Sequence, residues 1–296
     1  MTLHARPIGS ISRGAQRALY RHPNIQLALL LALPVGALAV MYLGSLGVLL
    51  LNAFWTLDPV TRQPVRELTL DNFVDVATSG VYRTITFRTI GMAALVTVTC
   101  ALVGFPVAYY MARIASLRTR STLVVCILLP LWASYLVKVF AWRAILQQEG
   151  VLNWLLQPLG LTGPGYGDVA VWLVFSYLWL PYMILPIYAG LERIPGSMLE
   201  ASSDLGGRPG TTFRRVVLPL AFPAVIAGSI FTFSLTMGDY IAPALVSSTQ
   251  FLGNVVQREV GIAGNLPLAA ALACIPVLVM LLYLFVARRL GAFEAL

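Results

Sequence analysis

The chain has 296 residues, of which 58% are hydrophobic and 11% are charged. A soluble domain carries about 25% charged residues, and the apolar residues here fall in long blocks, so this composition excludes an ordinary soluble domain. The net charge of +8 comes from short basic clusters between the blocks. These clusters form no basic face interleaved with aromatic residues, which argues against nucleic-acid binding. The sequence therefore predicts an all-α integral membrane protein.

Six apolar blocks are long enough to cross a bilayer, which takes about 20 residues per helix. They cover roughly 25–54, 86–112, 122–146, 169–191, 216–246 and 267–287. The first block is much longer than the core of a signal peptide, so it is expected to be a retained span. We expect a tail over 1–24, followed by one transmembrane domain over 25–296 with six helices.

The distribution of lysine and arginine indicates how these helices are oriented. If the N-terminus lies inside, the inner side receives Arg6, Arg13, Arg17, Arg21, Arg113, Arg118, Arg120, Arg193, Arg208, Arg214, Arg215, Arg288 and Arg289. Acidic residues gather on the other side, at Asp58, Glu67, Asp71, Asp75, Glu149, Asp168 and Glu259. The positive-inside rule therefore places both termini in the cytoplasm. The loops 55–85, with a short helix expected at Asp71–Thr78, and 147–168 then lie outside.

The inner loop 192–215 contains a short stretch with helical spacing. Glu200 and Asp204 are four residues apart, and Gly206-Gly207 is expected to end the helix. The following Arg208-Pro209-Gly210 predicts irregular chain. On this pattern alone, an ordinary polar loop between two spans explains the same residues.

The same stretch resembles the "EAA" loop of permease subunits in type I ATP-binding-cassette (ABC) importers, the MetI-like family. Glu200-Ala201-Ser202 is followed by three residues and Gly206, then by nine residues and Val216-Val217-Leu218-Pro219. One departure is Ser202, where the family pattern has a second alanine. The resemblance implies the type I ABC importer permease fold and a short helix that docks on a cytoplasmic ATPase. Its implied coupling residues are Glu200, Ala201, Ser202, Asp204 and Gly206.

Further stretches look like the spermidine/putrescine permease branch of this family. They are Trp132–Arg143, Gly150–Asn153, Gly238–Pro243, Gly253-Asn254 and Asn265–Pro267. The resemblance implies a binding-protein-dependent importer of polyamines or a related amino-containing solute in the bacterial inner membrane. Branches for 4-aminobutyrate, opines, 2-aminoethylphosphonate and ferric iron share much of the pattern. The implied partners are two ATPase subunits, a second homologous permease and an extracytoplasmic substrate-binding protein.

The sequence contains no P-loop pattern Gly-x-x-x-x-Gly-Lys-Ser/Thr, no cysteine cluster and no convergent catalytic set. We therefore expect no enzyme activity, metal or cofactor on this chain, with ATP and magnesium bound by the partner ATPase. The rival class is an ion-coupled secondary transporter. That class favours inverted repeats and coupling carboxylates near the middle of the membrane, whereas this chain shows no repeat and one acid within a predicted span.

That acid is Asp239, in the outer part of the predicted fifth span, while Lys138 and Arg143 lie in the outer half of the third. Two readings remain open: Asp239 pairs with one of these cations, or it faces the transport path and attracts a cationic solute. The aromatic residues nearby offer faces for an amine or form an interfacial belt. They are Tyr135, Trp142, Tyr177, Trp179, Tyr182 and Tyr240.

Overall fold

The computed structural model describes residues 23–291 and divides the chain into two units, 1–52 and 53–296. The predicted tail 1–24 lies almost entirely outside the described residues. The first unit contains α2 (Pro23–Leu38), the π-helical turn η1 (Ala39–Leu43) and α3 (Gly44–Asn52). Residues Leu30–Asn52 are apolar enough to span a membrane, and none of them is buried within the protein. This segment therefore supplies the first predicted span.

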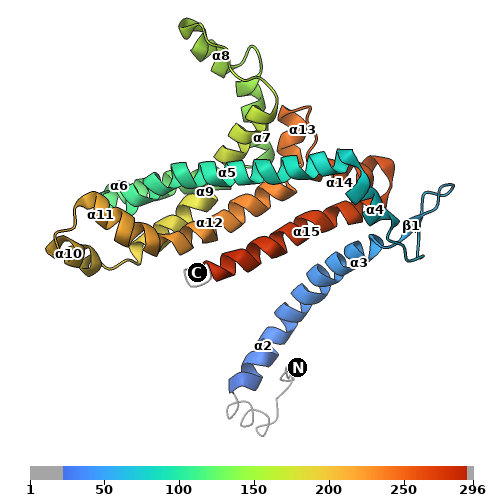
Figure 1. The fold of residues 1–296 in the computed structure, drawn as a ribbon, viewed down its shortest axis with the longest axis horizontal. Helices are drawn as coiled ribbons and strands as arrows, with labels where there is room; N and C mark the ends of the chain where they lie inside the picture. Colours follow the sequence, from blue (N-terminus) through green and yellow to red (C-terminus); the bar gives the residue numbers. More distant parts are fainter. Residues whose placement is uncertain (1–22, 292–296) are drawn as a thin grey trace, which may run out of the picture. The chain divides into compact units, whose positions relative to one another are not determined.

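The core of the second unit is a bundle of three long helices (Figure 1): α5 (Gly80–Arg113), α9 (Asp168–Glu192) and α12 (Leu218–Gly238). A fourth helix, α15 (Leu266–Arg289), packs beside α12. Small residues allow the helices to approach closely, since a Cβ on Gly190 of α9 would overlap the Cβ of Ala224 on α12. Helices in lipid commonly pack through such small residues.

The predicted third span, 122–146, is not one helix. It consists of α6 (Leu117–Trp132) and α7 (Tyr135–Leu146), which meet at an angle of 95°. Pro130 removes a backbone donor in the last turn of α6. Ala133 and Ser134 then adopt extended backbone angles, with ψ of 142° and 135°. The expectation of a continuous helix is therefore wrong, because the apolar block contains a break that hydropathy does not detect.

The predicted fifth span, 216–246, is also divided. α12 ends at Gly238, and the chain continues as α13 (Ile241–Val246), α14 (Leu252–Arg258) and the π-helical turn η4 (Glu259–Ala263) before α15. Within residues 23–291, five helices are long and apolar enough to cross a membrane, or six if α6 and α7 are one broken span. The number of predicted spans is thus matched only when the bent pair is counted as one.

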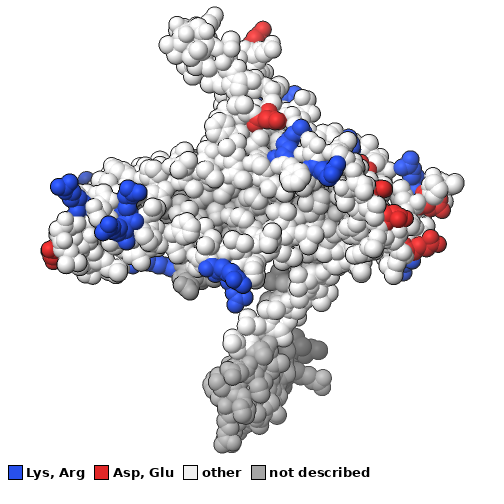
Figure 2. Space-filling view, in the orientation of Figure 1, with Lys and Arg blue, Asp and Glu red and all other residues white. Residues whose placement is uncertain are grey.

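The predicted outer loops contain small elements of their own. The expected short helix is confirmed as α4 (Asp71–Thr78), next to a two-residue antiparallel pair of β1 (Thr56–Leu57) and β2 (Pro64–Val65). The second outer loop contains α8 (Val151–Leu156) and the short turn η2 (Gln157–Leu159). On the face shown in Figure 2, acidic side chains are prominent at the end that carries α4. Basic side chains gather at the opposite end, with α10 and α11.

Candidate functional site

The loop between α9 and α12 forms a helical hairpin. It begins with α10 (Gly196–Asp204). Just after this helix, Gly206 has a φ of +77° and reverses the direction of the chain. The predicted end of the helix is therefore confirmed. The prediction of irregular chain at Arg208-Pro209-Gly210 is wrong. Pro209 instead starts α11 (Pro209–Thr212), which continues through the π-helical turn η3 (Phe213–Val217) into α12. Proline suits this position because the first helical residue needs no backbone donor.

Two hydrogen bonds hold the hairpin closed. The backbone N–H of Gly207 donates to the carbonyl oxygen of Ser202 at 2.8 Å. The hydroxyls of Ser202 and Thr212 lie 2.8 Å apart. Alanine, the residue that the EAA pattern has at Ser202, could not make the second bond. The departure from the pattern therefore has a structural role here, which sequence reasoning missed because Thr212 is ten residues away.

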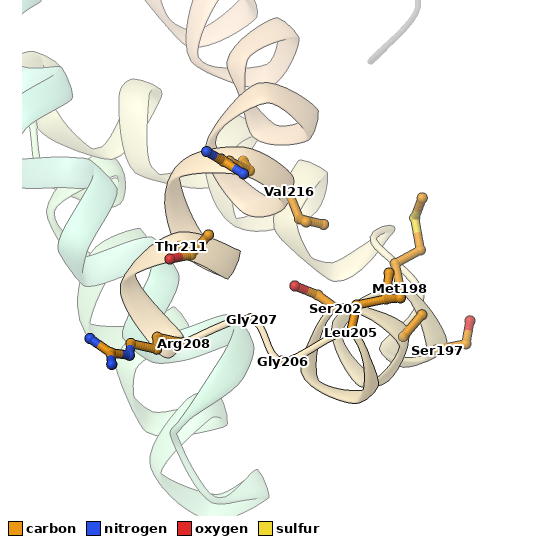
Figure 3. A pocket seen from close by; sticks show the side chains of 11 residues that line it. Ser197, Met198, Ser202, Leu205, Gly206, Gly207, Arg208, Thr211 and Val216 are labelled. Carbon is orange, nitrogen blue, oxygen red and sulfur yellow. The ribbon is translucent and has the colours of Figure 1, made fainter.

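Most of α10 is exposed to solvent. Glu200, Ala201 and Asp204 are exposed, and the side chain of Leu205 is 90% exposed. A pocket of about 750 Å³ lies between α10 and α11, which are joined by Gly206 and Gly207 (Figure 3). The structure thus brings all five predicted coupling residues onto one short hairpin. Its exposed apolar and small side chains suit contact with another protein.

The exit of the hairpin is fixed to the helical core. Phe213 of η3 packs edge-on against Phe105 and Tyr109 of α5, with ring centroids 5.8 and 5.5 Å apart and interplanar angles of 88°. Edge-to-face packing of this kind is favourable beyond the area that it buries. A displacement of the hairpin at this point therefore acts on α5 as well as on α12.

Asp239 lies at the C-terminal end of α12, outside the spanning helix in which it was expected. One carboxylate oxygen, Oδ1, accepts hydrogen bonds from the backbone N–H groups of Ile241 and Ala242 at 2.8 and 3.1 Å. The other, Oδ2, accepts from the hydroxyl of Tyr135 on α7. Within residues 23–291 no ion pair joins Asp239 to a lysine or arginine. The structure therefore does not support the reading of a pair with Lys138 or Arg143.

The predicted aromatic residues form more than one group. Tyr135 stacks on Trp179 at 6.2 Å, and Trp179 also contacts Tyr182 at 6.0 Å. Trp142 and Tyr177 pack on each other at 5.4 Å. Tyr240 instead lines an apolar cavity of about 440 Å³ between α12, α14 and α15. The structure thus links Asp239 to Tyr135 and, through stacked rings, to Trp179 and Tyr182, whereas Tyr240 lines a separate cavity.

A bundle of apolar helices with an exposed helical hairpin at one end defines a multi-pass membrane protein built to contact a partner. The family described as "Binding-protein-dependent transport system inner membrane component" matches residues 102–293. The chain belongs to this family, and it is a permease subunit of an ABC importer.

Two relatives illustrate the match. The chain is 45% identical over 293 residues to the inner membrane ABC transporter permease protein YdcU of Escherichia coli (strain K12), covering 94% of this chain and 93% of the relative. It is 30% identical over 228 residues to the spermidine/putrescine transport system permease protein PotB of Haemophilus influenzae, covering 75% and 79%. These relatives confirm the predicted resemblance to the spermidine/putrescine permease branch.

Solved structures show the same fold. A chain of a bacterial ABC transporter involved in the import of the acidic polysaccharide alginate superposes with a TM-score of 0.73 at 15% identity, covering 94% of this chain and 98% of that one. A chain of the MetNI methionine ABC transporter gives 0.55 at 18% identity, covering 71% and 94%. At such identities the likeness confirms the type I importer fold and says nothing of the solute.

Proposed function

We propose that this chain forms half of the membrane path of an ATP-driven importer for polyamines or a related small amino-containing solute, in the bacterial cytoplasmic membrane. The observation that carries the proposal is the exposed surface of α10, with Ala201 at its centre and Leu205 beside it. Small side chains let a partner backbone approach, an exposed leucine fills a hollow in the partner, and Glu200 can pair with a basic residue. We assign this surface to a cytoplasmic ATPase and propose that both termini lie on the same, cytoplasmic side.

The proposed cycle is alternating access. Two ATPase subunits, which bind ATP and magnesium, close and draw together the α10 hairpins of this chain and of a second, homologous permease. The path then opens outward, where a binding protein delivers the solute to the loops 55–85 and 147–168, and ATP hydrolysis resets the path. A related fold supports this set of partners, since the alginate ABC transporter was solved with an alginate-bound periplasmic protein.

The solute class is inferred from relatives and from one charge. PotB relatives are named for spermidine and putrescine. Asp239 adds a partly buried carboxylate next to the stacked rings of Tyr135 and Trp179. A negative charge beside aromatic faces favours an organic cation over an anion. We propose that Asp239, Tyr135 and Tyr182 face the solute, with Trp142, Tyr177 and Tyr240 farther along the path.

The test is uptake by proteoliposomes that contain this chain with the products of its neighbouring genes. Labelled spermidine, 4-aminobutyrate and an anionic amino acid are offered with ATP present or with an ion gradient alone. ATP-dependent uptake of spermidine that Glu200→Arg abolishes is expected. Arg118→Glu, a charge reversal at an exposed residue of the cytoplasmic end outside the hairpin, is the control. Uptake driven by an ion gradient without ATP would assign the chain to secondary transport.

A further inference from the structure

Two arginines and a glutamate join α5, α6 and α9 at the point where the chain enters α10. Arg113, the last residue of α5, donates through Nη2 to the carbonyl oxygens of Leu191 and Ile194, at 2.5 and 2.8 Å. Leu191 lies in the last turn of α9, and Ile194 lies in the link to α10, which begins at Gly196. Free carbonyls at the C-terminal end of a helix attract a cation. Arg113 therefore caps α9 from a neighbouring helix.

Arg120 lies in the first turn of α6 and makes three further bonds. Its Nε and Nη2 donate to the carbonyl oxygens of Met111 and Ala112 at the end of α5, both at 3.1 Å. Its Nη1 donates to the carboxylate of Glu192, the last residue of α9, at 2.7 Å. A planar guanidinium with five donors can make these bonds at once, which an ammonium on a flexible stem cannot.

We propose that Arg113, Arg120 and Glu192, named here the arginine clasp, are positioning residues that make α5, α6 and α9 follow every movement of α10. The proposal rests on the proposed function, because it assumes that an ATPase moves α10. Ile194, held by Arg113, is 5% exposed and lies two residues before α10. With Phe213 packed on α5 at the exit, both ends of the hairpin are fixed to the same helix.

This arrangement separates docking from transmission. Glu200, Ala201 and Asp204 are exposed, and in the proposed function they decide whether the ATPase binds. The clasp residues lie at the base of the hairpin, and the side chains of Arg120 and Glu192 are 28% and 38% exposed. Loss of the clasp should therefore leave the ATPase bound. The helix α10 should then move relative to α5, α6 and α9 instead of moving together with them.

The test measures a distance within this chain in the assembled transporter, with no need to know the solute. Cysteines replace Ile114, in the exposed turn after α5, and Ser203 on α10, in a background lacking the three native cysteines. Both positions carry spin labels, and the distance between them is measured without nucleotide and with ATP and vanadate. The unaltered clasp is expected to give one narrow distribution with the same mean in both states.

The variants are Glu192→Gln, Arg120→Gln and the more conservative Arg120→Lys. We expect a broadened distribution whose mean shifts with nucleotide, at unchanged co-purification of the ATPase. The control is Arg118→Gln, an exposed arginine in the same turn of α6, which should behave as the parent. Narrow, nucleotide-independent distances in Glu192→Gln and Arg120→Lys would overturn the clasp. Failure of the parent chain to retain any ATPase would instead overturn the proposed function.

Discussion

Replacing Gly207 with alanine tests whether the closed α10–α11 hairpin is the form that the ATPase binds. A Cβ at Gly207 would lie 2.6 Å from the carbonyl oxygen of Ser202 and 2.7 Å from its hydroxyl oxygen. Both distances are too short for a carbon–oxygen contact, so Ser202 or the turn must shift. The shift breaks the Gly207 N–H bond to Ser202 and the bond between Ser202 and Thr212.

The expected size of this effect follows from the two lost bonds. Each hydrogen bond of this kind stabilises the closed form by about 1 kcal/mol, or about 2 kcal/mol together. If only the closed hairpin docks, the affinity for the ATPase falls by at most about 30-fold. In Gly206→Ala the added Cβ would meet no atom within 4 Å, so the only strain comes from the backbone φ of +77°. That strain is about 1 kcal/mol, or about fivefold in affinity.

The assay is binding of the purified ATPase to the permease in lipid nanodiscs, followed by uptake with the same variants. Gly210→Ala is the control, because its Cβ meets no atom within 4 Å and its backbone angles are helical. The expected order of affinity is the parent and Gly210→Ala first, then Gly206→Ala, then Gly207→Ala. Unchanged binding in Gly207→Ala, or equal losses at all three glycines, would refute the role of the closed hairpin.

Three further predictions concern topology, the solute and helix packing. In a background without the native cysteines, a cysteine at Gln63 should react with a membrane-impermeant thiol reagent in intact cells, and one at Arg118 should not. The opposite result would show that the chain is oriented the other way in the membrane. Asp239→Asn should lower spermidine uptake about tenfold at normal expression, whereas normal uptake by the well-expressed variant contradicts a direct role. Gly190→Ala should lower the melting temperature of the purified protein by overlap with Ala224, a loss of about 1–3 kcal/mol. Ala224→Gly in the same chain should restore the melting temperature, and a Gly190→Ala variant as stable as the parent would contradict the packing.

The coupling hairpin was predictable because its signals are local. A glycine is required where the backbone takes a φ of +77°, and the pattern Glu200 to Gly206 lies within one short helix. Helix α4 was predicted for the same reason. Thr212, Arg120 and Glu192 were not singled out, because their roles depend on contacts between segments that lie far apart in the sequence. A spacing pattern contains no information on such contacts.

The two divided spans show the limit of hydropathy. The block 122–146 is mainly apolar, and its break at Ala133 and Ser134 depends on backbone angles. The block 216–246 continues as apolar sequence past Gly238, although the helix ends there. Non-helical backbone at membrane depth must be hydrogen-bonded within the protein or border a cavity containing water. At the second break, the carboxylate of Asp239 accepts hydrogen bonds from the backbone N–H groups of Ile241 and Ala242, which would otherwise lack partners within the helix.

This bonding limits what Asp239 can offer to a solute. One of its oxygens binds two backbone N–H groups, and the other accepts from Tyr135. A carboxylate has about four acceptor sites, so Asp239 can offer a solute about one hydrogen bond besides its charge. One bond and one charge separate cations from anions but distinguish poorly between amines of different length. If Asp239 faces the path, the choice among polyamines must come from the binding protein or from the second permease, and Asp239→Asn should lower uptake of spermidine and putrescine by similar factors.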